Sequence, residues 1–420
     1  MKNNYVLKGT FIDTKIIGKL RVQEGYAVCK DGKFIGIFKD VPVEYNNYEL
    51  IDYSKYLIIP GMSDLHLHAP QYAYTGTAMD VQLLEWLDKY TYKEESKFEN
   101  IDFAKDRYKY FIDDLLKTET TRASIFATIH TDATLVLMKE MEKSGLKGYV
   151  GKLAMNRNCP DYYREESTKK AIKETNRWLD NCDFKNVKPI LTPRFTPNVT
   201  DDYMQELGIV AHKKHIPMQS HLDENLEEIE WVKNLCPNAK HYSDTYDRYG
   251  LFGKDCDTIM AHCIYCNDEE NELIKKNNVM IAHCPTSNTN VIAGIAPAAY
   301  YLRNGYRIGL GSDVAGGHTL SLLDVMVYAV QVSKMRTLFK ENIEKPLTIV
   351  EAFYMATVGG GSFFGNVGLF EEGYDFDAVV INDLDKDNSM IFNINERFEK
   401  MVYSKKRSII AKFVSGEKLF

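Results

Sequence analysis

Eight apolar, strand-like runs separated by long charged stretches constrain the fold of this chain more than any other feature. The stretches between the runs have the length and charge of helices, so the pattern predicts parallel strands joined by helical crossovers. Eight parallel strands favour closure into a TIM-like (β/α)₈ barrel, an α/β fold. The runs are SDLHLH (63–68), SIFATIH (124–130), GYVGKLAMN (148–156), KPILTPRF (188–195), PMQSHLDE (217–224), TIMAHC (258–263), VMIAHC (279–284) and RIGLGSD (307–313).

An open, doubly wound sheet is the structural alternative to the barrel. Such a sheet would normally carry a nucleotide-binding loop, G-x-G-x-x-G or G-x-x-x-x-G-K-[ST], and the sequence contains neither pattern. The glycine run 359–361 follows an expected helix and is interpreted as a close-packing turn. The barrel is therefore the preferred architecture.

The two ends of the chain differ from its middle in sequence pattern. YAVCK and KFIGIF, joined by a turn at Asp31-Gly32, resemble short strands, as do FDAVVIN and RSIIAKFV near the C-terminus. Neither end is long enough to bury much surface alone, and 420 residues leave room for a large domain with a small one attached. We expect residues 1–60 and 368–420 to form one composite β-sandwich domain, with the barrel at 61–367.

Composition excludes several classes of function. The net charge is −7 and no lysine/arginine block occurs, which argues against nucleic acid or an anionic membrane as a partner. No run of eighteen apolar residues is present, so no membrane-spanning helix is expected. The N-terminus MKNNYVLKGTFIDTK lacks the features of a secretory signal, and the eight cysteines are scattered. A cytoplasmic location is the resulting expectation.

Metal-capable side chains recur near the C-terminal ends of the predicted strands. They are His66 and His68 on the first, His221 on the fifth, His262 on the sixth and Asp313 on the eighth. Strand side chains alternate, so the two histidines of the first strand face the same side. One histidine on an apolar strand is more often a core residue than a ligand. Five such residues at the face where these barrels hold their active sites predict a metal centre.

The number of metal ions follows from the fourth strand. Barrels of this class that hold two ions bridge them with a carboxylated lysine there, and KPILTPRF offers no inward lysine. Lys152, on the third strand, is assigned a packing role. One ion per chain is expected, with zinc as the best match to three histidines and an aspartate and iron(II) as the alternative.

A single catalytic metal would activate a water molecule by lowering its pKa from 15.7 to about 7, and an acid must then protonate the leaving group. Glu224 lies three residues after His221, in SHLDEN, at the end of a strand. It could merely be an acid that favours a helix N-terminus. Its proximity to a metal-binding strand favours a role in proton transfer.

At this point a family resemblance can be stated. The segments PGMSDLHLHAPQY, LTPRF, MQSHLDENLEEIEWVKNLCP, MAHCIYC, IAHCPTSN and GLGSDVAGG together resemble the guanine deaminases of the amidohydrolase superfamily, over essentially the whole chain. HLH and the isolated aspartate mark only the superfamily. HAPQY, TPRF and the glutamate of SHLDEN are specific to the guanine deaminases.

The resemblance implies hydrolysis of guanine to xanthine and ammonia in a homodimeric enzyme. It implies metal ligation by His66, His68, His221 and Asp313, with His262 completing the metal shell or holding the water. It gives catalytic roles to Glu224, Asp313 and His262. The implied substrate-binding residues are His68, Gln71, Arg194, Phe195, His221, Glu224 and Asp313.

Two positions depart from the family pattern. Ser312 stands where the family often has threonine, and Asp223 where it often has serine. Neither departure removes a ligand, so they bear on the shape of the pocket alone.

Three rival functions remain. Another mononuclear deaminase or dechlorinase should lack the HAPQY and TPRF pair. A catalytically inactive scaffold should have lost ligands, which this chain keeps. A two-metal cyclic-amide hydrolase is disfavoured by the missing lysine.

Overall fold

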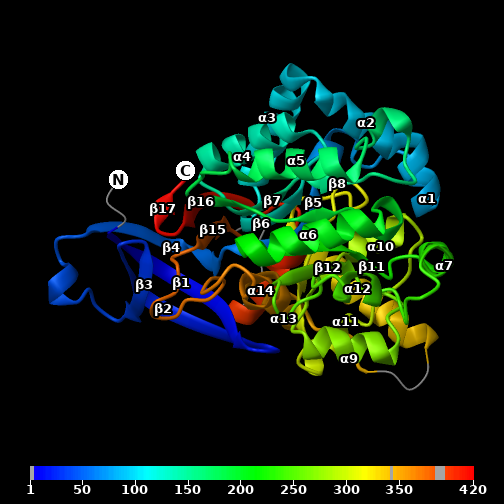
Figure 1. The fold of residues 1–420 in the computed structure, drawn as a ribbon. Coiled ribbons are helices and arrows are strands. Elements are labelled where there is room, and N and C mark those ends of the chain that lie inside the picture. Colours follow the sequence, from blue (N-terminus) through cyan, green and yellow to red (C-terminus); the bar gives the residue numbers. More distant parts are fainter. Residues whose placement is uncertain (1–3, 341–343, 384–392) are drawn as a thin grey trace.

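The computed structural model describes residues 4–340, 344–383 and 393–420, which fold into two packed parts (Figure 1). One part, on the left in Figure 1, is a sheet built from both ends of the chain, and the other contains the parallel strands with helices around them. None of the described helices combines the length and the apolar composition needed to cross a membrane. The helices are α1 (Leu83–Trp86), α2 (Tyr92–Ser96), α3 (Ile101–Leu116), α4 (Thr131–Ser144), α5 (Thr168–Leu179), α6 (Asp201–Lys214), α7 (Leu226–Leu235), α8 (Asp244–Asp247), α9 (Asp268–Lys276), α10 (Pro285–Asn290), α11 (Ala298–Arg303), α12 (Leu322–Phe339), α13 (Ile349–Tyr354) and α14 (Ile394–Tyr403).

The two chain ends share one seven-stranded sheet, in the order β17-β16-β15-β4-β1-β2-β3. Strands β15 and β4 run antiparallel, and this pair joins the C-terminal segment to the N-terminal one. The β2–β3 hairpin turns at Asp31-Gly32, where φ values of 50° and 79° give the left-handed pair typical of a tight hairpin. The strands are β1 (Tyr5–Ile16), β2 (Lys19–Lys30), β3 (Lys33–Phe38), β4 (Glu49–Pro60), β15 (Ala378–Asn382), β16 (Ser408–Val414) and β17 (Glu417–Lys418).

This sheet curls around an aromatic core. The edge strand β3 returns to the segment just before β15, where the backbone N–H of Phe34 donates to the carbonyl of Tyr374 at 2.9 Å. Across the core, the rings of Tyr5 and Phe413 lie 5.3 Å apart. The two chain ends thus share one sheet, while the division into two domains and the sandwich arrangement stay predictions. Residues 384–392 of the predicted 368–420 segment lie outside the described residues.

The parallel strands form two four-stranded sheets, β5-β6-β7-β9 and β11-β12-β13-β14. Backbone hydrogen bonds join the sheets on both sides, from Gln219 N to Leu191 O at 2.9 Å and from Asp313 N to His66 O at 2.8 Å. Short strands β8 and β10 pair beside them. The strands are β5 (Met62–His68), β6 (Thr120–Phe126), β7 (Lys147–Gly151), β8 (Leu153–Ala154), β9 (Val187–Pro189), β10 (Thr192–Pro193), β11 (Met218–Leu222), β12 (Thr258–His262), β13 (Met280–His283) and β14 (Arg307–Leu310).

Seven of the eight predicted runs extend beyond their strands by at least one residue, as the second, fourth and eighth runs illustrate. Strand β6 ends at Phe126, because the chain then turns so that His130 can serve as the N-cap of α4. The fourth run is divided into β9 and β10. Strand β14 ends at Leu310, and Asp313 lies past it with φ of 47°, in the left-handed region rather than the β region. In each case the predicted run continues past the C-terminal end of the observed strand.

A buried ionic cluster ties the two parts together. The guanidinium of Arg122, on β6, donates to Asp377 at 2.8 Å and to Asp375 at 2.7 Å, and both aspartates lie just before β15. The side chains of Arg122 and Asp377 are 7% and 1% exposed. Removal of one partner would leave a buried charge uncompensated.

We therefore expect Arg122→Met to lower the free energy of unfolding by about 3–5 kcal/mol, measured by urea denaturation. Lys33→Ala is the matched control, because Lys33 pairs with the same Asp375 from a position that is half exposed. That control should cost less than about 1 kcal/mol. Equal effects of the two substitutions would contradict the structural role given to Arg122.

A second prediction concerns Lys412, whose buried ammonium on β16 donates to the carbonyls of Leu116 at 2.6 Å and Thr120 at 2.9 Å. Burial lowers its pKa to about 7, although the charge of Glu119 opposes the shift. Lysine titrates near ~10.4 in an unfolded chain, so above pH ~7 the unfolded state binds more protons and the contribution of Lys412 to stability rises with pH.

Urea unfolding at pH 7, 8 and 9 tests this expectation. The difference in free energy of unfolding between the wild type and Lys412→Met should shift in favour of the wild type as the pH rises. Lys418→Met, at an exposed position on β17, should give a difference that does not change with pH. A constant difference for Lys412→Met would contradict the assignment.

Candidate active site

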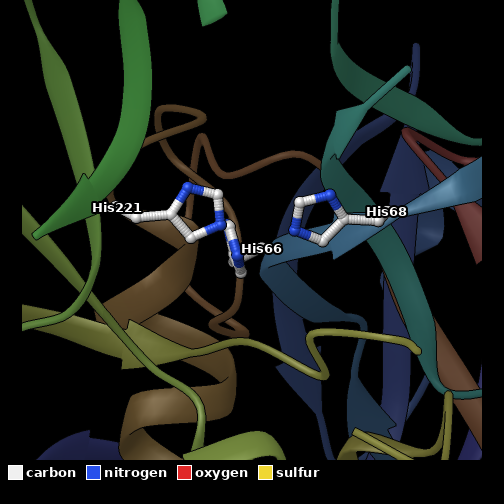
Figure 2. Close-up of side chains that lie close together, drawn as sticks. All are labelled: His66, His68 and His221. Atoms are coloured by element: carbon white, nitrogen blue, oxygen red, sulfur yellow. The ribbon is translucent and has the colours of Figure 1, made fainter. Parts of the chain in front are cut away.

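Four imidazoles meet at the C-terminal ends of the parallel strands. His66 and His68 come from β5, His221 from β11 and His262 from β12. Figure 2 shows the rings of His66, His68 and His221 directed into one shared space from the facing strands. The ring of His66 lies 4.9 Å from that of His68 and 4.8 Å from that of His221, measured between centroids. The same-side orientation predicted for the two histidines of β5 is confirmed.

The carboxylate of Asp313 lies among these rings. Its Oδ1 is 3.2 Å from Nε2 of His66 and 3.4 Å from Nε2 of His68, and its Oδ2 is 3.8 Å from Nε2 of His262. Burial alone would raise the pKa of Asp313, but the neighbouring imidazoles outweigh burial and lower that pKa far below its ordinary value. Asp313 is thus an anion at neutral pH.

Burial also favours the uncharged form of three of these imidazoles. Removal from water lowers the pKa of His262 to about 4, and it lowers the pKa values of His68 and His221 well below the ordinary histidine value. A neutral imidazole is the form that binds a metal ion.

Two of the rings are oriented by hydrogen bonds to their other nitrogen. Nδ1 of His221 lies 2.6 Å from the carbonyl oxygen of Arg194, and Nδ1 of His262 lies 2.8 Å from Oδ1 of Asn288. Because both partners are acceptors, each Nδ1 must donate, which leaves the Nε2 lone pair of each ring directed into the cluster. Such outer contacts orient the ligands of metal sites in proteins.

The donor set fits a single metal ion. Ligand atoms of His66, His68 and His221 lie within 4.8 Å of one another, as do those of His66, His262 and Asp313. The Nε2 atoms of His66 and His262 are buried without a hydrogen-bond partner. Unpartnered buried nitrogens are costly, and a divalent cation would satisfy them. Lys152 lies between β7 and β8 and forms a buried ion pair with Glu165 at 2.5 Å.

A cavity opens directly above this cluster. Eight of the nine predicted site residues line this cavity. The ninth, His66, is fully buried beneath it. The sequence did not identify the apolar wall contributed by α1 and the turn after it. The complete lining is His68, Gln71, Leu83, Trp86, Leu87, Arg194, Phe195, His221, Glu224, His262, Ser287, Val291, Asp313 and Gly316.

Polar groups for recognition lie on one side of the cavity. Arg194 directly follows β10, and its side chain is 3% exposed. Its guanidinium forms two hydrogen bonds with the carboxylate of Glu95, and Nε2 of Gln71 donates to the same carboxylate at 2.8 Å. Nothing in the helical segment around Glu95 signals this contact, because Glu94 and Glu99 nearby have the same residue type.

Glu224 lies next to the histidines of the cluster. Its Oε2 is 3.4 Å from Nε2 of His262, and its side chain is 5% exposed. Burial raises the pKa of Glu224 well above its ordinary value, and the negative charges of Glu228 and Asp313 add to the shift. Both effects favour the protonated form of the carboxyl group, which is the form that can act as an acid.

Comparison with known proteins places this geometry in a family. The model of the amidohydrolase family matches residues 57–417. Guanine deaminase of Mus musculus is 43% identical over 77% of this chain and 72% of its own length, and guanine deaminase of Dictyostelium discoideum is 35% identical over 100% and 99%. A crystal structure of guanine deaminase from C. acetobutylicum, with guanine bound in its active site, superposes with a TM-score of 0.95. It is 44% identical and covers 99% of this chain and 100% of its own.

The donor set leads to a prediction about metal content. Protein purified without chelator should contain about one divalent metal ion per chain by elemental analysis. His221→Ala should lower that content strongly, whereas His212→Ala, at an exposed position on α6, should leave it unchanged. Two tightly held ions per chain, or equal metal content in both variants, would contradict the single-site assignment.

Proposed function

This chain belongs to the amidohydrolase family, and we propose that it is an enzyme that hydrolyses guanine to xanthine and ammonia. The observation that carries the proposal is the placement of a histidine-aspartate cluster and a donor-rich wall, Arg194 with Gln71, on one cavity. The histidine-aspartate cluster fits hydrolysis at an amidine carbon. The donors of Arg194 and Gln71 fit a purine whose C6 carries a carbonyl. The relatives of similar length are guanine deaminases, and one of them binds guanine in its active site.

We infer that the two parallel sheets form one closed (β/α)₈ barrel at residues 61–367. The backbone hydrogen bonds at both junctions between the sheets support closure. The small domain would consist of residues 1–60 and 368–420, folded as a β-sandwich around the aromatic core. The homodimer and the cytoplasmic location expected from the sequence stay predictions.

His66, His68, His221 and Asp313 would hold one divalent ion, with His262 beside them. Three imidazoles and a carboxylate suit zinc, and iron(II) is the alternative. When bound, such an ion lowers the pKa of a water molecule and so supplies the nucleophile for hydrolysis.

The protein side chains divide the remaining work. Asp313 would accept a proton from the attacking water, and His262 would hold that water toward the substrate. Phe195 lines the cavity and offers its ring to the purine, while Arg194 and Gln71 donate to the C6 carbonyl edge.

Glu224 would transfer the protons. It first protonates the ring nitrogen adjacent to C2, which makes that carbon more electrophilic, and the C2–O bond forms. Glu224 would then regain a proton, the one that Asp313 took from the water, and deliver it to the amine, so that the C2–N bond breaks with ammonia rather than an amide anion as the leaving group. The hydroxyl proton on C2 would return to Glu224 as the carbonyl of xanthine forms. Water supplies the oxygen of xanthine.

An assay of guanine and adenine side by side tests the proposal. Guanine should be consumed with release of one ammonia per xanthine formed, and adenine should react far more slowly. Adenine has no amine at C2 to be released, and its only exocyclic amine lies at C6, where it would present a donor to the donors of Arg194 and Gln71. Equal activity on both purines would leave hydrolytic deamination standing and contradict the choice of guanine. A chain inactive on all purines would favour the rival of an inactive scaffold.

Glu224→Gln should retain the fold and the metal but lose about 10²–10⁴-fold in kcat, because glutamine cannot donate a proton as an acid. Glu227→Gln is the matched control, since Glu227 lies three residues later, in the first turn of α7, and is exposed. Elemental analysis should give the same metal content for both variants. A kcat near that of the wild type for Glu224→Gln would move the proton transfer to another group.

A further inference from the structure

Glu95 is a buried carboxylate that the proposed chemistry does not use. It lies on α2 and its side chain is 0% exposed. It receives three hydrogen bonds, from Nη1 of Arg194 at 2.6 Å, from Nη2 of Arg194 at 3.2 Å and from Nε2 of Gln71 at 2.8 Å. Glu95 is not one of the cavity-lining residues in the described part of the chain, and it touches two that are. Glu95 can therefore influence the cavity through its contacts with Gln71 and Arg194.

The contacts of Glu95 determine how Gln71 is oriented. A carboxylate can only accept, so the amide nitrogen of Gln71 must face Glu95. The amide oxygen of Gln71 accepts from the backbone N–H of Ala315 at 3.3 Å, on its other side. If the amide flipped, its oxygen would face the carboxylate of Glu95 and its NH₂ group would face the N–H of Ala315. The contacts therefore fix one orientation of the amide. The second N–H of the Gln71 amide remains available to donate into the cavity.

Arg194 is oriented in the same way. Two of its nitrogens are engaged by Glu95, and its guanidinium lies 5.3 Å from the ring centroid of Tyr92, which is also on α2. A guanidinium carries five N–H donors, so the fork retains donors for the cavity that it lines. A carboxylate and an aromatic ring from one short helix thus fix the position of the arginine.

We infer that Glu95 is a positioning residue that holds the donors of Arg194 and Gln71 toward the carbonyl edge of a 6-oxopurine and so determines substrate selectivity. This inference rests on the proposed function. In guanine the groups at that edge, O6 and N7, are both acceptors, which matches a wall of donors. A purine without the carbonyl would gain little from the arrangement.

The test compares guanine with 2-aminopurine, which has the same C2 amine and a hydrogen at C6. Glu95→Gln keeps the shape of the side chain, removes the charge and introduces an NH₂ group facing donors. We expect kcat/KM for guanine to fall about 10- to 100-fold, mainly through KM, because hydrogen bonds to charged groups are involved. The value for 2-aminopurine should change less than about 3-fold. The ratio between the two substrates is the diagnostic quantity, since loss of folded protein lowers both values equally.

Glu165→Gln is the matched control. Glu165 forms a comparably buried ion pair with Lys152, at 2.5 Å, and neither residue lines the cavity in the described part of the chain. Its substitution should leave the guanine to 2-aminopurine ratio unchanged. On the background of Arg194→Ala, Glu95→Gln should lower the ratio little further, because its effect passes through the arginine. If Glu95→Gln does not fold, Glu95→Asp takes its place, with an intermediate loss of the ratio expected.

The possible failures are distinguishable. A wild type that deaminates neither purine overturns the proposed function. A wild type active on guanine together with a Glu95 variant of unchanged ratio overturns the role of Glu95 and leaves the proposed function intact.

Discussion

The contact of one buried carboxylate, Asp313, with three buried imidazoles is the interaction on which the rest of this structure depends. Neutral imidazoles present lone pairs, and a carboxylate presents negative charge, so the cluster concentrates electron density in a region without bulk water. Such a group is stable only when a cation is shared among its members. The requirement for a metal is therefore a property of the apolar surroundings as much as of the ligands themselves.

The parallel strands make this cluster geometrically possible. The backbone N–H of Asp313 donates to the carbonyl of His66 at 2.8 Å, which holds the loop after β14 against the end of β5. Asp313 adopts φ of 47° and His262 adopts φ of 75°. Non-glycine residues are rarely found in this region, and such strain concentrates at functional sites that the surrounding fold holds in place. The strain here redirects both side chains from the strand direction into the cavity.

The metal-binding residues could be predicted from sequence because their positions follow the strand period. His66 and His68 are two residues apart on a buried strand, and the alternation of side chains alone places them on one face. The composite sheet was predictable for a similar reason, since both chain ends carry strand-like segments that need partners. Glu95 and Trp86 could not be found in this way, because their helices approach the cavity from outside the repeating pattern. The ends of β6, β9 and β14 were misplaced because the predicted runs continue past the strands, with apolar residues after β6 and β9 and with Gly311, Ser312 and Asp313 after β14.

Arg194 shows why two interpretations of one residue need not compete. The family resemblance implies that Arg194 binds the substrate, and the structure contains its ion pair with Glu95. A guanidinium that is 3% exposed could not remain without a counterion, because an unpaired buried charge costs several kcal/mol, on the order of 3–5. The ion pair with Glu95 is therefore compatible with the proposed recognition of a carbonyl by Arg194, because the five donors of the fork allow both contacts at once.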